Sequence, residues 1–199
     1  MFDRVTIYAS DLDASQRFYD TVLRTIGGGS EDFSLAAATD EHPVTRRLHI
    51  AFFAPSRAHV DEFWRAGTSA GYRDDGEPGP RPQYREDYYG GFLLDPDRNS
   101  AEAVHHGALR TPGRIDHLWI RVADVAASKR FYEAIAPRAS IRLRHDAPDR
   151  AQFAGEGGSF SLVSGDEPTE HVHMAFPADE DDTLVDPDGN TVELVRGDR

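Results

Sequence analysis

Two histidines and a glutamate are the residues of this 199-residue chain whose types best suit metal chemistry. His117 lies in an alternating segment, on the same face as Trp119 and Arg121. His49 opens an apolar segment, and Glu102 lies in another that follows a tight turn. Two imidazoles and one carboxylate on facing strands make an open site for a divalent metal such as Fe, Mn, Ni or Zn. Open coordination positions let such a metal bind a substrate oxygen or activate water.

A second set of the same residue types occurs later in the chain. His173 and Glu193 match His49 and Glu102 in motif and order, so that either pair can complete a site with His117. A single histidine on a strand is more often a hydrogen-bonded structural residue than a ligand. The repetition of the pattern in both halves favours a metal site over that reading.

Three tyrosines of one loop are the candidates for proton transfer. The hydroxyl groups of Tyr84, Tyr88 and Tyr89 would orient a substrate or carry a proton if the loop covers the metal. The simpler reading is that these side chains cover the edge of a sheet. Trp119 and Arg121, beside His117, would supply an aromatic wall and an anchor for an anionic group.

Most of the chain repeats once, and the repeat defines the elements that position these residues. Residues 3–23 and 116–136 are identical at eight of 21 aligned positions, including an Arg-Phe-Tyr run. The segments DPDRNSAEAV and DPDGNTVELV also correspond. A period this long indicates a duplicated domain. We therefore predict one domain over 1–110 and a second over 114–199, joined by a Thr-Pro-Gly linker.

Each half consists of two units of the type strand–helix–strands. The units are one (1–45), two (46–110), three (114–167) and four (168–199). Matched motifs lie closer together in units one and four, so these are trimmed copies, whereas units two and three are full length.

Hydrophobic periodicity and turn residues predict the individual elements. The strands are expected at 3–9, 33–38, 48–53, 91–95, 100–106, 115–122, 140–145, 150–154, 159–164 and 170–176, followed by a final hairpin. Helices are expected after a cap at Asp11 or Asp13, over 56–70 and over 125–136. The segment 72–90, rich in proline, glycine and tyrosine, is expected to be a loop.

The order of these motifs resembles the vicinal oxygen chelate superfamily. Its members include glyoxalase I, the fosfomycin and bleomycin resistance proteins and the extradiol dioxygenases. The matching motifs are Asp-His leading into Ser-x-x-Phe-Tyr, then His-Ile-Ala-Phe, then Asp-Pro-Asp-Gly-Asn-x-x-Glu. The resemblance implies an α+β fold in which four βαβββ-type units, two of them trimmed, form two curled mixed sheets around a metal or ligand cavity.

The resemblance also implies which residues hold a metal. The ligands would be His117, with His49 and Glu102 or with His173 and Glu193. Arg4 stands where the histidine of unit one would lie.

Two pairings of the units are consistent with the family. In the first, neighbouring units pair, one with two and three with four. In the second, unit two pairs with unit three and unit one pairs with unit four. We expect the second arrangement, because it places both trimmed units in one cavity and leaves the other intact. The metal ligands are then His117, His49 and Glu102. Arg4 would lie near Glu193 as a fixed cation in place of a metal.

Two functions follow from the resemblance. The first is a divalent-metal-dependent enzyme acting on a small oxygenated substrate chelated to the metal. Its chemistry would be that of a lyase or isomerase, as in glyoxalase I, or of an extradiol-type dioxygenase. The alternative is a metal-free protein of the bleomycin-resistance type that binds a small molecule or antibiotic. The net charge of −13 would suit a cationic ligand in that case.

Composition narrows the partners further. The acidic charge argues against nucleic acid, because phosphate contacts need clustered basic residues. No apolar run approaches the roughly 18 residues of a membrane span, and no export signal is visible. The chain has no cysteine, which excludes disulfides and thiolate metal sites. We expect a cytoplasmic monomer or homodimer with a small molecule as its partner.

Overall fold

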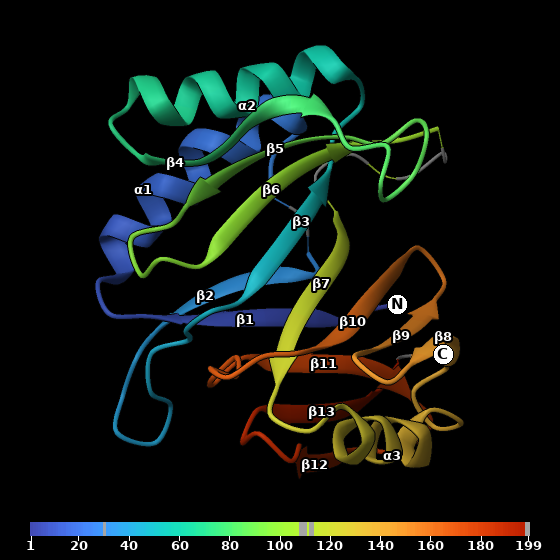
Figure 1. The fold of residues 1–199 in the computed structure, drawn as a ribbon. Helices are drawn as coiled ribbons and strands as arrows, with labels where there is room; N and C mark the ends of the chain where they lie inside the picture. The colour runs from blue at the N-terminus through green and yellow to red at the C-terminus, as the bar shows by residue number, and fades with distance from the viewer. Residues whose placement is uncertain (30, 108–110, 112–113, 198–199) are drawn as a thin grey trace.

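Two mixed β-sheets form the frame of the molecule, and three α-helices lie against them in the part of the chain described here (Figure 1). The computed structural model describes all residues except 30, 108–110, 112–113 and 198–199. The predicted α+β class with two mixed sheets is confirmed. Two of the three residues of the predicted Thr-Pro-Gly linker lie outside the described residues. None of the described helices has the length and apolar character that a bilayer crossing would need.

The described residues of the first half form six strands and two α-helices. They are β1 (Arg4–Ala9), α1 (Leu12–Leu23), β2 (Phe33–Ala37), β3 (His49–Phe53), α2 (Arg57–Ser69), β4 (Arg73–Pro80), β5 (Tyr89–Leu94) and β6 (Ser100–His105). The second half contains β7 (Ile115–Val122), α3 (Val125–Ile135), β8 (Arg142–Ala147), β9 (Arg150–Gly155), β10 (Gly158–Ser164), β11 (His173–Ala178), β12 (Asp182–Val185) and β13 (Thr191–Arg196).

Each sheet combines strands from both halves of the sequence. The larger sheet has the order β4-β5-β6-β3-β7-β10-β9-β8, and the smaller has the order β12-β13-β11-β1-β2. Antiparallel pairing of β3 with β7 joins unit two to unit three, and pairing of β1 with β11 joins unit one to unit four. The expected exchange of partners is therefore confirmed. The extent of the two sequence domains, 1–110 and 114–199, stays a prediction.

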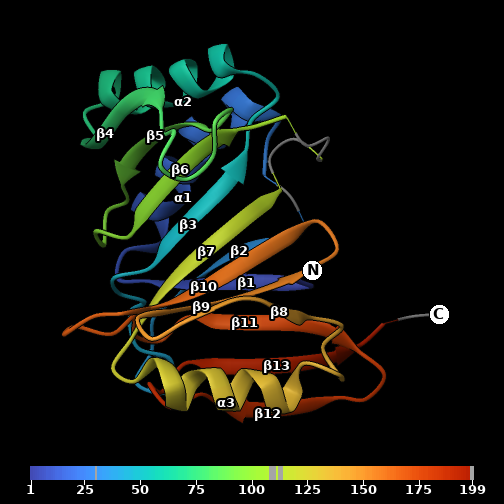
Figure 2. The same cartoon turned by 45° about the vertical axis from the view of Figure 1, so that its right-hand side comes forward.

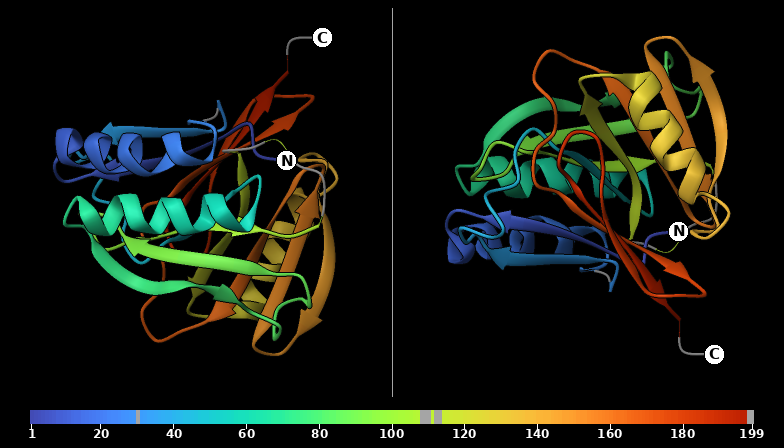
Figure 3. Two further views of the ribbon diagram at one scale, coloured as in Figure 1. Left: turned by 90° about the horizontal axis from the view of Figure 1, so that it is seen from above. Right: turned by 90° about the horizontal axis from the view of Figure 1, so that it is seen from below.

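Helix α1 begins at Asp11, one of the two predicted caps, and α3 begins after Asp124, the corresponding residue of the second half. The Asp11 side chain accepts a hydrogen bond from the Ala14 amide at 2.9 Å, and Asp124 accepts one from the Ala127 amide at 3.0 Å. Each bond satisfies a free donor of the first helical turn. Helices α1 and α2 lie side by side, whereas α3 lies at the other end of the molecule (Figures 2 and 3).

The apolar faces of the two sheets and the helices enclose one core. Phe33 of β2 lies 5.1 Å from Phe52 of β3, and Phe160 of β10 lies 5.9 Å from Phe176 of β11, measured between ring centroids. Both pairs join the small sheet to the large one through aromatic contacts at the core, in which Phe33 is partly buried and the other three rings are fully buried. Strand alternation turns the opposite face of the large sheet, which carries His49, away from this core.

A repeated contact explains why two motifs recur together. The hydroxyl of Tyr19 on α1 donates to Asp95 at 3.1 Å, and the hydroxyl of Tyr132 on α3 donates to Asp186 at 3.0 Å. The Arg-Phe-Tyr run of one unit therefore binds the Asp-Pro-Asp turn of the next. Burial raises the pKa of Asp95 to about 6 and also raises that of Asp186.

The expected loop over 72–90 is wrong for its first half. Residues Arg73–Pro80 form β4, which pairs with β5 at the edge of the large sheet. The register shifts between Asp74 and Gly76 and again between Gly76 and Gly79. An edge strand with such irregularities tolerates proline and glycine, and this composition hides the strand from hydrophobic periodicity.

Candidate metal centre

Three adjacent strands bring His49, Glu102 and His117 together on one face of the large sheet. Ala51 of β3 lies opposite Glu102 of β6 on one side and opposite His117 of β7 on the other. His49, two residues before Ala51, shares the same face. The candidate ligand atoms of the three residues all lie within 4.8 Å of one another.

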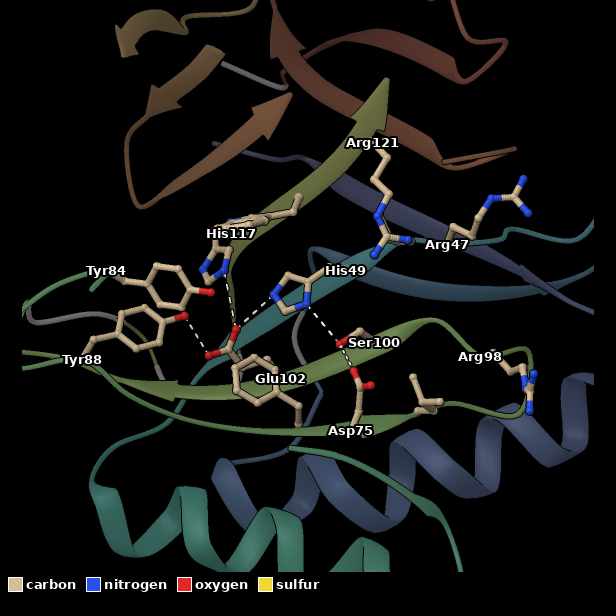
Figure 4. Close-up of a pocket in the computed structure, with 14 residues that line it drawn as sticks. Arg47, His49, Asp75, Tyr84, Tyr88, Arg98, Ser100, Glu102, His117 and Arg121 are labelled. Atoms are coloured by element: carbon tan, nitrogen blue, oxygen red, sulfur yellow. Dashed lines mark hydrogen bonds and ion pairs between the residues drawn. The ribbon is translucent and has the colours of Figure 1, made fainter. Parts of the chain in front are cut away.

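His49 and His117 each direct their Nε2 atom toward the Glu102 carboxylate (Figure 4). The Nε2 atom of His49 lies 3.0 Å from Glu102 Oε2, and the Nε2 atom of His117 lies 3.6 Å from the same oxygen. Two nitrogens and a carboxylate oxygen that converge in this way match the ligand types of a first-row divalent metal.

The second nitrogen of each histidine has its own partner. His49 Nδ1 lies 3.1 Å from the Ser100 hydroxyl, which in turn donates to Asp75 at 2.7 Å. His117 Nδ1 lies 2.9 Å from a carboxylate oxygen of Asp116. Contacts of this kind fix the orientation and tautomer of a metal-binding imidazole and leave Nε2 for the metal.

The Glu102 carboxylate is buried and held from one side. Its side chain is 1% exposed, and its Oε1 atom accepts a 2.7 Å hydrogen bond from the Tyr88 hydroxyl. Burial and the neighbouring charge of Glu102 raise the pKa of Tyr88 far above its ordinary value. Tyr88 therefore remains a protonated donor at neutral pH. A buried carboxylate needs a compensating positive charge, which a bound metal or a protonated histidine provides.

The residues fit a divalent metal by their chemistry. The set offers two neutral nitrogen donors and one anionic oxygen donor, and each donor side chain has a further contact that orients it. This is the donor combination of open catalytic sites, which leave coordination positions for water or substrate.

The other predicted site residues separate into two groups. Tyr84 is half exposed, and its ring lies 5.3 Å from that of Tyr88 and 5.6 Å from that of Trp119. Trp119 and Arg121 line the same cavity as the two histidines. Tyr89 instead donates its hydroxyl to Asp61 of α2 at 2.8 Å, on the helix-covered face of the sheet. The structure does not bring Tyr89 to the candidate metal centre.

Sequence comparison adds a decisive observation to this geometry. Residues 1–103 match the family model described as the Glyoxalase/Bleomycin resistance protein/Dioxygenase superfamily. The chain belongs to this superfamily. No curated protein matches it in sequence.

Solved structures agree with this superfamily fold over nearly the whole chain. Glyoxalase I from Zea mays has a TM-score of 0.69 and 18% sequence identity, covering 98% of this chain and 92% of its own. A putative dioxygenase from Bacillus subtilis has a TM-score of 0.62 and 10% identity, covering 97% of this chain and 84% of its own. At these identities the likeness establishes the glyoxalase-type fold.

The cavity of this superfamily member is rich in arginine. It measures about 340 Å³ and extends from the candidate metal centre to Arg47, Arg98 and Arg121. Arg47 is held by an ion pair of 2.5 Å with Glu170 and by a 2.8 Å bond to the Pro168 carbonyl. The lining also contains the carboxylates of Asp75 and Glu102, so the strongly negative net charge of the chain does not extend into this cavity.

The small sheet carries a second histidine–glutamate pair, which forms no three-ligand group among the described residues. His173 Nε2 lies 2.9 Å from Glu193, and the Tyr8 hydroxyl lies 3.2 Å from His173 Nδ1. Arg4 and Glu193 both lie opposite Ala175, in the relation that His117 and Glu102 have to Ala51.

The expected ion pair between Arg4 and Glu193 is wrong. No ion pair joins them among the described residues, and Glu193 has His173 as its partner. Because the Glu193 side chain is 40% exposed, its charge needs no fixed cation to compensate for burial.

Sequence reasoning missed a buried chain of contacts behind His117. Asp116 accepts from His117 through one oxygen, and its other oxygen lies 2.9 Å from His106 Nε2. His106 is only 6% exposed, and its bonded partner Asp116 belongs to β7. One sequence signal was available. An aspartate directly precedes the candidate ligand position of the first strand in both halves, as Asp3 before Arg4 and Asp116 before His117.

Proposed function

We propose that the protein is a divalent-metal-dependent enzyme of the glyoxalase/dioxygenase type. Its substrate is a small oxygenated molecule whose oxygens chelate a metal held by His49, His117 and Glu102. The observation that carries this proposal is the convergence of two imidazole Nε2 atoms on one buried carboxylate oxygen. When bound, such a metal supplies Lewis acidity and a template for the substrate.

Individual side chains have distinct roles in this proposal. Tyr88, protonated and bonded to Glu102, holds the carboxylate in place and is not a base. Tyr84 lies at the cavity wall with an exposed ring, and it is the tyrosine best placed to exchange a proton with solvent and substrate. Trp119 forms an apolar wall, and Arg121 anchors an anionic group.

The donor set favours dioxygenase chemistry over that of glyoxalase I. The parallel pairing of β7 with β10 repeats that of β3 with β6, so Ser161 is the counterpart of Glu102. A serine at this position leaves one carboxylate in the set. Two histidines and one carboxylate are the ligands of non-haem iron oxygenases.

The proposal needs only one chain. His49 and Glu102 come from the first half and His117 from the second, so the three ligands do not require a partner subunit. A monomer or homodimer and a cytoplasmic location remain our predictions.

Cobalt(II) provides a direct test, because its visible spectrum reports both binding and ligand exchange. We expect the loaded protein to show d–d bands that change on addition of catechol, a probe with two adjacent oxygens. The His117→Ala variant should lose the bands, whereas His145→Ala, a change on the distant edge strand β8, should keep them. A wild-type protein that binds no cobalt would instead support the metal-free binding protein of the bleomycin-resistance type.

A further inference from the structure

A second cavity adjoins the candidate metal centre. It measures about 500 Å³ and shares four wall residues with the first cavity, namely Tyr84, Tyr88, His117 and Trp119. The remaining wall comes mainly from β8, β9 and β10, the outer strands of unit three. A ligand in this cavity therefore lies next to a molecule bound at the metal centre.

The strand register explains why these walls form one surface. Trp119 of β7 lies opposite Ser161 of β10, and Ser161 lies opposite Gln152 of β9. Directly opposed residues share a face of a sheet, so this row continues the face that carries His117. Arg150 lies two residues before Gln152 on β9 and therefore shares this face.

The cavity is strongly basic. Its lining contains four arginines, namely Arg85, Arg142, Arg144 and Arg150. Its one acidic lining residue among those described is Asp116, which is buried and already bonded to His106 and His117. Clustered cations in a protein with a net charge of −13 require an explanation, because they repel each other unless an anion lies between them.

One of the four arginines is held in place before any ligand arrives. The guanidinium carbon of Arg150 lies 5.1 Å from the centroid of the Trp119 ring, and an Nη atom donates to Ser161 at 3.1 Å. Stacking on an aromatic ring and one hydrogen bond leave other N–H donors of the fork for an acceptor.

Two other arginines have no acidic partner among the described residues. Arg142 and Arg144 are exposed, and neither forms an ion pair with any residue that the structure describes. The fourth arginine, Arg85, is neutralised by its ion pair with Asp87. The free positive charge of the cavity therefore comes from Arg142, Arg144 and Arg150.

We propose that this second cavity is an anion-binding subsite for a carboxylate or phosphate group. This inference rests on the proposed function, because it assigns the anion to the same substrate whose oxygens chelate the metal. The planar fork of arginine matches both groups through paired hydrogen bonds. The substrate is then an anionic oxygenated molecule that lies along Trp119, with its charged end toward β8.

Fluorescence of Trp119 tests the subsite without a metal. The Trp64→Phe background removes the other tryptophan, which lies on α2. The metal-free protein is titrated with inorganic phosphate and, separately, with acetate, at constant ionic strength. We expect a saturable change with at least one of them, and the tighter probe identifies the preferred group. In the Arg142→Gln/Arg144→Gln double variant this affinity should fall about tenfold, as expected for lost charge-assisted hydrogen bonds.

A matched double variant controls for net charge. Arg17→Gln/Arg24→Gln, on and beside α1, removes the same two charges away from the cavity and should leave the affinity unchanged. Absence of saturable binding, or equal weakening in both double variants, would overturn the subsite. Cobalt loading separates the two proposals. An Arg142→Gln/Arg144→Gln variant that binds cobalt but has lost its anion affinity supports both of them. A Trp64→Phe parent protein that binds the anion but no cobalt contradicts the metal centre and leaves the anion subsite standing.

Discussion

The Tyr88 hydroxyl donates a 2.7 Å hydrogen bond to the Oε1 atom of the buried Glu102 carboxylate. The bond occupies one oxygen and leaves Oε2 facing the two histidines. The Tyr88→Phe variant should therefore fold but bind a divalent metal about tenfold more weakly, as is typical when a residue that orients a ligand is lost. Competition with a chromogenic chelator measures this affinity.

Tyr84→Phe is the matched control for this change. It removes a tyrosine hydroxyl from the same cavity wall, but from a residue that makes no hydrogen bond to Glu102. Its metal affinity should equal that of the wild type. Equal affinities for Tyr88→Phe and the wild type would show that the hydroxyl does not position the carboxylate.

The backbone of β5 passes close to the same carboxylate at Gly90. A Cβ atom at this position would overlap Glu102 Oε1 and would lie 3.1 Å from the Tyr88 ring. Gly90→Ala should therefore displace the carboxylate and reduce metal affinity at least as much as Tyr88→Phe does. Gly29→Ala is the control, because no described atom outside its two chain neighbours lies within 4 Å of the added Cβ there. Unchanged metal binding in Gly90→Ala would show that the site can adapt.

The buried Asp95 gives stability a predictable dependence on pH. Its pKa is raised from 3.8 to about 6, chiefly by burial, with nearby Asp97 also contributing. Between these two values the folded state binds more protons than the unfolded state, so the free energy of unfolding falls as pH rises. The shift corresponds to a loss of roughly 3 kcal/mol across this range.

Chemical denaturation of the wild type and Asp95→Asn at several pH values between 4 and 7 measures this effect. The variant lacks the titrating group, so its stability should fall less steeply over the range, even though its absolute stability is lower. Parallel pH profiles would contradict the assignment. The comparison is made without metal, so that metal binding contributes to neither pH profile.

Sequence patterns predicted the parts of this molecule that are local or duplicated. Alternation located β7 and its ligand face, an aspartate cap located α1, and the repeat of that segment located α3. The unequal trimming of the repeats also predicted that units two and three pair with each other. This pairing places both trimmed units in one cavity and leaves the other cavity intact.

Features set by tertiary contacts were beyond such patterns. Strand β4 has a composition typical of a loop and exists because β5 offers an edge to pair with. The burial of His106 has no local sequence signal, because its bonded partner Asp116 belongs to β7, which follows later in the chain. The basic second cavity was also hidden, since its arginines lie on separate strands of an acidic chain.

Metal content after loading and dialysis tests the central claim most directly. We predict one divalent ion per wild-type chain, almost none in Glu102→Gln, and one in His173→Ala. Glu102→Gln keeps the size and shape of the side chain but removes its charge, and His173→Ala removes the equivalent histidine of the small sheet. A Glu102→Gln protein that keeps its metal, or a His173→Ala protein that loses it, would contradict the assignment of the site to His49, Glu102 and His117.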